Sequence, residues 1–294
     1  MRPPIATVTA VALVMAALSG CSPRVEPAPA PAATGDPSWL AEVSATAEVY
    51  RTRSDPARGG LQLSVTNTGT TPLTVVHALL DSPALAEAIE RDRTTVIPPG
   101  ATRDLALLLP PPRCDGGPTL PEAVLTVALA SGATAQLRLP TTDRIGQWVD
   151  WHERACFAQA AAAQVDLEVR RAPALDDVAT GTIGAELVAT ARVSGVRLVA
   201  IADTVLFGLR AGPTDSGRVS TLTLDRALSV AETTVVPIWL AAARCDPHAI
   251  ADDKQGTLFT VYLDLAGETG TTTVIAADET RADLYDAIAE TCGF

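Results

Sequence analysis

The chain contains one pattern twice: PGATRDLALLLPPPRCD at residues 99–115 and VAETTVVPIWLAAARCD at residues 230–246. The two segments align without a gap at a constant offset of 131 residues, and both end in Arg-Cys-Asp. Before each cysteine, apolar residues alternate with other residues, which is the period of a strand with one buried face. These apolar residues are Leu105, Leu107 and Leu109 in the first copy and Val236, Ile238 and Leu240 in the second. The repeat predicts two copies of one strand-rich unit.

The residues that follow each segment also correspond. A second alternating strand runs into a turn in both copies, and a helical spacing of apolar residues closes each unit. The strand residues are Leu125, Val127 and Leu129 before Ser131-Gly132, and Val261, Leu263 and Leu265 before Gly267. The helical residues are Ile145, Trp148, Val149, His152 and Cys156 in the first copy, and Leu284, Ile288 and Cys292 in the second. Thr280 and Asp283 have the spacing of a capping box at the second helix.

Short alternating segments with frequent turn residues also precede the repeated stretch in both copies. We therefore predict an all-β (mainly β) chain of two tandem antiparallel β-sandwich domains, each with a short closing helix. The predicted domains are residues 39–158 and 163–294, with the boundary near residues 158–164.

Five cysteines are present, and the first, Cys21, lies in an N-terminal motif of its own. The other four recur at equivalent places, 42 residues apart in the first copy and 47 in the second. This recurrence predicts the disulfides Cys114–Cys156 and Cys245–Cys292, each contributing about 4 kcal/mol on the chain-entropy model. Two other arrangements stay open: four free buried thiols, and a Cys114–Cys245 bond that would merge the copies into one sandwich.

The N-terminus predicts an exported, lipid-anchored protein. Arg2 is followed by an apolar segment from Ile5 to Leu18, too short to span a membrane, and then by Leu18-Ser19-Gly20-Cys21, which resembles a bacterial lipobox. We predict a signal peptide at residues 1–20 and lipidation of Cys21, with a retained transmembrane helix as the other reading. Residues 21–38 are rich in Pro and Ala and are expected to form an extended tether.

The charge balance disfavours nucleic acid as a partner. The chain has 22 Lys and Arg residues against 34 Asp and Glu, a formal charge of −12, and Lys254 is its only lysine. Phosphate backbones are bound by clustered basic residues. We therefore expect no nucleic-acid partner.

The sequence contains no recognisable catalytic motif. His77, His152 and His248 have no metal-ligand spacing, and the only methionines, Met1 and Met15, lie in the signal peptide. Asp252-Asp253 and Asp176-Asp177 are read as solvated acidic turns, although the first pair could bind Ca²⁺ loosely. Neither Gly-x-Ser-x-Gly nor a phosphate-binding Gly-rich loop occurs. We predict no metal, no cofactor and no catalytic residue.

The repeated Arg-Cys-Asp triplet has two readings. An Arg–Asp pair could pin each cysteine loop to its own sandwich, or the arginine of each copy, Arg113 and Arg244, could bind a ligand.

The stretch Leu61 to Gly69, followed by Pro72 to Val75, resembles a strand-turn-strand phrase of bacterial immunoglobulin-like sandwich modules. True immunoglobulin domains have Tyr two residues before the second cysteine, where this chain has Arg154 and Glu290. As a whole, the chain resembles actinobacterial (Gram-positive) lipoproteins with tandem immunoglobulin-like domains. The resemblance implies attachment to the extracytoplasmic face of the cell membrane.

These observations favour a non-enzymatic, lipid-anchored envelope protein that binds or scaffolds an envelope protein or glycan, with membrane lipid held through Cys21. The alternative is a cell-wall-acting enzyme or an accessory subunit of one, with Trp148, Trp151 and His152 near a cleft.

Overall fold

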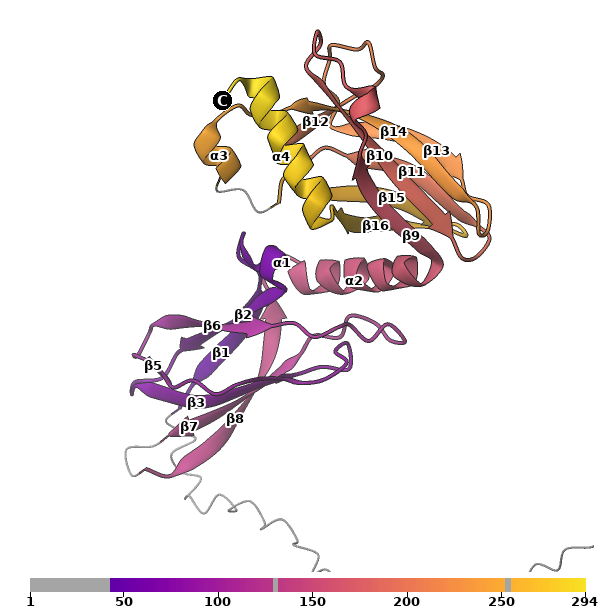
Figure 1. The fold of residues 1–294 in the computed structure, drawn as a ribbon. Coiled ribbons are helices and arrows are strands. Elements are labelled where there is room, and N and C mark those ends of the chain that lie inside the picture. The colour runs from indigo at the N-terminus through magenta and orange to yellow at the C-terminus, as the bar shows by residue number, and fades with distance from the viewer. Residues whose placement is uncertain (1–42, 129–131, 252–254) are drawn as a thin grey trace, which may run out of the picture. The chain divides into compact units, whose positions relative to one another are not determined.

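The structure, a computed structural model, describes residues 43–128, 132–251 and 255–294 (Figure 1). The predicted signal peptide, Cys21 and the tether at residues 21–38 lie outside the described residues, as do the pair Asp252-Asp253 and the predicted turn residues Leu129 and Ser131. The described chain is mainly β, as predicted, with sixteen strands and few helices.

The first half contains eight strands and two helices. In chain order they are β1 (Ala45–Tyr50), α1 (Asp55–Arg58), β2 (Gly60–Asn67), β3 (Leu73–Asp81), β4 (Ile89–Arg91), β5 (Thr95–Ile97), β6 (Thr102–Leu108), β7 (Glu122–Ala128), β8 (Thr134–Asp143) and α2 (Gln147–Gln164). The alternating segment before Cys114 is thus β6, and the one before the first turn is β7.

The second half has a similar order, with a 3-10 turn in the place of α1 and an additional helix before the last two strands. Its elements are β9 (Val165–Arg171), the 3-10 turn η2 (Pro173–Leu175), β10 (Thr182–Ala191), β11 (Val196–Ala202), β12 (Phe207–Arg210), β13 (Thr221–Ala227), β14 (Thr233–Ala242), α3 (Pro247–Ala251), β15 (Leu258–Leu265), β16 (Glu268–Ile275) and α4 (Asp278–Cys292).

In the first half all strands belong to one sheet, in the order β4-β3-β7-β8-β1-β2-β6, with β5 also paired to β3. The joint is a short parallel ladder between β1 and β8, in which Ala47, Glu48 and Val49 lie opposite Thr141, Thr142 and Asp143. The prediction of a purely antiparallel sandwich is therefore wrong here. Strands from the two ends of the unit meet side by side, and this contact cannot be read from local patterning.

The second half has two four-stranded sheets, β12-β14-β10-β9 and β13-β11-β15-β16. All of their strand pairs are antiparallel. Buried side chains of both sheets, among them Leu187, Ile238, Leu198 and Val261, belong to one hydrophobic cluster. The two sheets therefore share a core.

Several strand pairs are equivalent in the two halves, and one of them has the same irregularity in both. The ladder between β3 and β7 shifts register between Val75 and His77, and the ladder between β11 and β15 shifts between Leu198 and Ala200. The repeat matches Val127 of β7 to Leu263 of β15, and these residues pair with Val75 and Leu198 respectively. The same β-bulge therefore occurs at the same place in both copies.

Helix α2 supplies side chains to two hydrophobic clusters. Trp148 and Trp151 belong to the cluster of the first half, whereas Phe157 and Ala161 belong to that of the second. The helix begins where the Asp143 carboxylate accepts hydrogen bonds from the backbone N–H groups of Gln147 and Trp148, both at 2.9 Å.

Three details of the predicted helices are wrong. Ile145 precedes α2 and is 74% exposed, and Val149 lies on the outer face. Helix α4 begins at Asp278 after the N-cap residue Ala277, so Thr280 and Asp283 form no capping box. The chain enters α4 directly from β16, which moves the helix start ahead of the predicted cap.

Candidate functional site

Two disulfides, Cys114–Cys156 and Cys245–Cys292, join residues within each copy, with Cα–Cα distances of 5.5 and 5.3 Å. This is the pairing that the repeat predicts, and the Cys114–Cys245 bond does not occur. Each bond connects the loop after β6 or β14 to the helix that closes its unit.

The arginine and aspartate of each Arg-Cys-Asp triplet form no ion pair with each other, and the first triplet holds its loop through the backbone. In the part of the chain that the structure describes, neither Arg113 with Asp115 nor Arg244 with Asp246 forms a salt bridge. The Arg113 N–H donates instead to the Ala84 carbonyl at 2.9 Å. The predicted Arg–Asp pair is therefore wrong.

Trp148, Trp151 and His152 come together, but they do so inside the protein. Trp148 is fully buried and His152 is 4% exposed. The Trp148 indole donates from Nε1 to the Thr119 carbonyl at 3.0 Å, and its ring centroid lies 5.0 Å from that of Trp151. These three residues belong to the packing of α2 and line none of the cavities described below.

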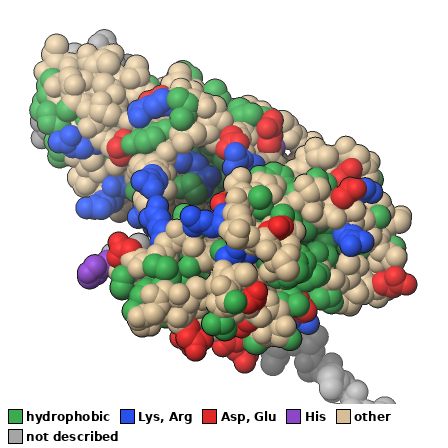
Figure 2. Space-filling view, turned by 90° about the horizontal axis from the view of Figure 1, so that it is seen from above, with side chains coloured by type: hydrophobic (Ala, Val, Ile, Leu, Met, Phe, Trp, Pro, Cys, Tyr) green, Lys and Arg blue, Asp and Glu red, His purple; other side chains and the backbone are tan. Residues whose placement is uncertain are grey.

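The other histidines lie apart from them. His77 is on β3, where its Nδ1 is 2.8 Å from Asp92 Oδ1, and His248 is exposed on α3. Several arginines are paired with acids, for example Arg138 with Glu122 and Arg144 with Glu48. Figure 2 shows side chains of both charges on one face, among apolar ones.

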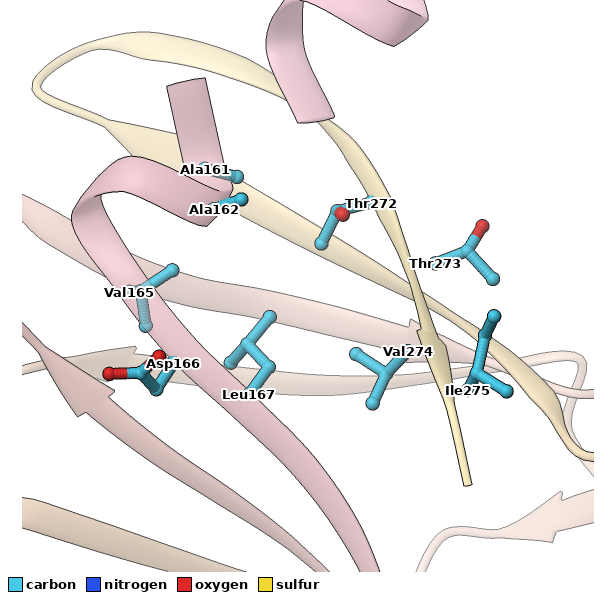
Figure 3. Close-up of a pocket in the computed structure, with 9 residues that line it drawn as sticks. All are labelled: Ala161, Ala162, Val165, Asp166, Leu167, Thr272, Thr273, Val274 and Ile275. Atoms are coloured by element: carbon cyan, nitrogen blue, oxygen red, sulfur yellow. The ribbon is translucent and has the colours of Figure 1, made fainter. Parts of the chain in front are cut away.

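A groove of about 270 Å³ lies between the edges of β9 and β16 (Figure 3). It is lined by the end of α2 (Ala161 and Ala162), the start of β9 (Val165, Asp166 and Leu167) and the end of β16 (Thr272, Thr273, Val274 and Ile275). Among the described strands, β9 pairs only with β10, and β16 pairs only with β15. Both strands therefore present an edge to the groove.

The equivalent edges in the first half are joined. The repeat matches Leu105 to Val236, and these residues pair with Leu63 and Leu187, which in turn pair with Val49 and Val169. Strand β9 therefore corresponds to β1, and by the same reasoning β16 corresponds to β8. The parallel ladder that joins β1 to β8 has no counterpart between β9 and β16.

Strand length explains the difference. Strand β8 has 10 residues and pairs with β1 through its last three, whereas β16 has 8 residues. Leu137 and Thr272 occupy equivalent register positions, so residues 141–143 correspond to residues 276–278. There the chain already turns into α4, which begins at Asp278. The second copy thus forms a helix where the first copy closes its sheet.

The groove has an apolar floor and no unpaired charge among its lining residues. Val165 and Val274 are 4% and 6% exposed, and the only charged lining residue, Asp166, is ion-paired with Arg192. Arg192 also donates from Nη1 to the Ala162 carbonyl at 2.6 Å and from its backbone N–H to Gln164 at 2.7 Å. This one side chain and its backbone fix the junction between α2 and β9, and with it one wall of the groove.

A second cavity, of about 300 Å³, lies between the loop after η2 and α4. Its main polar groups are already paired: Arg171 donates to both carboxylate oxygens of Asp176 at 2.8 and 2.6 Å. Burial raises the pKa of Asp176, but hydrogen bonds from Arg171 and from the Gly184 N–H outweigh it and hold the pKa below its usual value. The β9–β16 groove is therefore the better candidate for a binding site.

The groove was not predicted from the sequence. A signal was present, because the run Glu268–Ile275 is rich in threonine and is shorter than its counterpart Thr134–Asp143. This short run indicates a groove only because β9 lies beside it, and that arrangement is visible only in the fold.

No protein-family model matches the chain, and no curated protein matches it. Solved structures resemble it weakly. A red sea bream transglutaminase is 11% identical with a TM-score of 0.21; the match covers 81% of this chain, which spans 31% of that one. A chaperone–tip adhesion subunit complex of Csu pili from Acinetobacter baumannii is 12% identical with a TM-score of 0.20, and the YadV chaperone is 11% identical with 0.23. Each match covers 79% of this chain and 100% of the other. TM-scores this low indicate nothing about function.

Two features are absent from residues 43–128, 132–251 and 255–294. None of their helices is long and apolar enough to cross a membrane. They contain no group of three or more His, Cys, Asp or Glu side chains placed to hold a metal ion.

Proposed function

We propose that this chain is a lipid-anchored, extracytoplasmic envelope protein with tandem immunoglobulin-like units, and that it binds a partner rather than catalysing a reaction. The groove between β9 and β16 carries the proposal, because it places two strand edges beside an apolar floor. Its partner is an extended, uncharged peptide segment of an envelope protein.

The chemistry of the groove fits such a peptide. Edge strands carry unpaired backbone N–H and C=O groups that can pair with an added strand, and pockets between side chains then select the residues of that strand. Val165, Leu167 and Val274 favour small apolar side chains, and the ion pair of Asp166 leaves no free charge for a charged peptide. In the first copy, the β1–β8 ladder occupies the corresponding edges.

Binding is tested by a substitution taken from the first copy. Thr273 corresponds to Arg138, so Thr273→Arg introduces a charge into the groove at a position where the repeat already carries Arg. The full-length protein should recover a partner from detergent-solubilised membranes of its own host, and Thr273→Arg should lose it.

The matched control is Thr221→Arg on β13, the opposite edge of the same sheet. This variant should retain the partner. Undiminished recovery with Thr273→Arg would contradict the groove as the binding site, and turnover in a hydrolase screen would contradict a non-enzymatic role.

Anchoring depends on Cys21, because two acyl chains are needed for stable attachment and no other residue matches a lipidation motif. Cells fed a labelled fatty acid should label the wild-type protein and not the Cys21→Ala variant. Equal labelling of the two would contradict the lipobox.

A further inference from the structure

The Cys114–Cys156 disulfide has a buried histidine beside it. His152 Nε2 lies 2.9 Å from the carbonyl oxygen of Arg113 and 3.7 Å from Cys156 Sγ. A carbonyl oxygen can only accept a hydrogen bond, so Nε2 carries the proton and donates it. An N–H donor is therefore held next to the sulfur of Cys156.

The second copy provides a matched disulfide without a histidine. Ile288 stands four residues before Cys292, as His152 stands four residues before Cys156, and it is fully buried. Cys292 Sγ instead lies 3.8 Å from the carbonyl oxygen of Arg244. In both copies the first cysteine is exposed and the second is half-buried, so the two bonds differ in the histidine rather than in exposure.

We propose that Cys114–Cys156 is a site of thiol–disulfide exchange with a dithiol, whereas Cys245–Cys292 is structural. A thiolate of the dithiol attacks the exposed Cys114 Sγ, the S–S bond breaks, and Cys156 leaves as a thiolate. The His152 N–H, which donates to the Arg113 carbonyl in the oxidised protein, becomes shared between that carbonyl and the thiolate. The thiolate is thereby stabilised and its departure favoured, since a leaving thiol of lower pKa leaves faster. Cys156 then takes a proton from solvent.

The second thiol of the dithiol completes the reaction. It loses its proton to solvent and attacks the sulfur by which the dithiol is bonded to Cys114. This attack releases Cys114 as a thiolate, which is then protonated. The dithiol is oxidised to its disulfide, and the cystine is reduced to two thiols by the same two electrons and two protons.

The loop that carries Cys114 is held in place by contacts other than the disulfide. The Arg113 N–H donates to Ala84 at 2.9 Å, the Ala86 N–H donates to Pro111 at 3.1 Å, and Trp148 Nε1 donates to Thr119 at 3.0 Å. After reduction the two thiols therefore stay close together, and the bond can re-form without refolding of the unit.

The test compares the two disulfides within one molecule. Detergent-solubilised full-length protein is treated with dithiothreitol at neutral pH, quenched with acid at intervals and alkylated, and both cysteine pairs are followed by peptide mass mapping. Cys114–Cys156 should be reduced about tenfold faster than Cys245–Cys292. A monothiol should form its mixed disulfide on Cys114. Equal reduction rates, or a mixed disulfide mainly on Cys156, would overturn the proposal.

Two variants separate the effect of the histidine from that of the exposure of the disulfide. His152→Ile installs the residue of the second copy, and the reduction rate of Cys114–Cys156 should fall to within about threefold of that of Cys245–Cys292. His152→Gln keeps an N–H donor and should keep most of the rate. An unchanged rate in folded His152→Ile, or an equal loss in both variants, overturns the role of the hydrogen bond. If His152→Ile does not fold, the wild-type comparison still decides.

Discussion

Asp55 is a buried carboxylate at the start of α1 whose hydrogen bonds are all local. It accepts from the Thr52 backbone N–H at 2.6 Å, from the Thr52 hydroxyl at 2.7 Å and from Gln62 Nε2 at 3.0 Å, and it pairs with Arg58 at 3.0 Å. Burial raises the pKa of Asp55, but the bonds from Thr52, Gln62 and Arg58 together lower it below the ordinary 3.8. The charged form is therefore favoured in the folded protein.

Asp55→Asn should lower the free energy of unfolding by about 1–3 kcal/mol at pH 7. The reason is that an NH₂ donor then faces the donors from which a carboxylate oxygen accepted hydrogen bonds. A folded-state pKa below the unfolded value stabilises the protein above about pH 4, and this contribution is lost as the pH falls through the folded pKa. Urea denaturation at pH 7 and at steps below pH 4 should show that the difference in free energy of unfolding between wild type and variant becomes smaller.

Asp81→Asn is the control, because this residue is exposed at the end of β3. It should change the free energy of unfolding by less than about 0.5 kcal/mol. If the difference in free energy of unfolding between wild type and Asp55→Asn stayed constant down to pH 2, the charge of Asp55 would not contribute to stability.

At the scale of elements, β10 packs against η2 through a glycine. A Cβ on Gly184 would lie 2.5 Å from Leu175 Cβ and would meet the carbonyl oxygen of Ala172. The Gly184 carbonyl also accepts from the Ala172 N–H at 3.0 Å. The turn after β9 therefore lies directly on the backbone of β10.

Gly184→Ala should destabilise the protein by about 1–3 kcal/mol, since backbone atoms cannot move aside as a flexible side chain can. Gly217→Ala is the matched substitution, because its Cβ would meet nothing within 4 Å. Thermal unfolding followed by circular dichroism measures both. Equal midpoints for the two variants would contradict the close packing of η2 on β10.

Alternating apolar residues were sufficient to locate β6, β7, β14 and β15, because one face of each strand is buried and the other is more exposed along most of its length. Alternation cannot show which edges meet. The β1–β8 ladder joins residues more than 90 positions apart, and the open β9–β16 edge depends on where β16 turns into α4. The disulfides could be predicted because a duplication repeats their spacing, whereas the His152 contact with Cys156 required coordinates.

At the scale of the whole molecule, α2 does not belong to one half alone. The predicted boundary near residues 158–164 separates Phe157 from the second core, although Phe157 packs against Gly270 of β16 and belongs to that cluster. A fragment of residues 163–294 therefore lacks side chains that its own core uses.

A fragment of residues 147–294 with Cys156→Ser should be more stable than the fragment 163–294 by about 1.5–3 kcal/mol, the value of burying one large apolar side chain. Urea denaturation of the two fragments measures the difference. Phe157→Ala in the longer fragment should remove most of it. Equal stability of the two unsubstituted fragments would mean that α2 serves the first core alone.

The two disulfides also set how far the chain can be stretched. A chain pulled at its two ends bears tension along its backbone, and each cystine carries that tension across the residues that it encloses. The bonds bypass spans of 42 and 47 residues. Even when fully unfolded by force, the oxidised chain would be roughly 300 Å shorter than the reduced one. Reducing Cys114–Cys156 alone would add about half of that length. The redox state of one bond would therefore determine how far the chain extends under force.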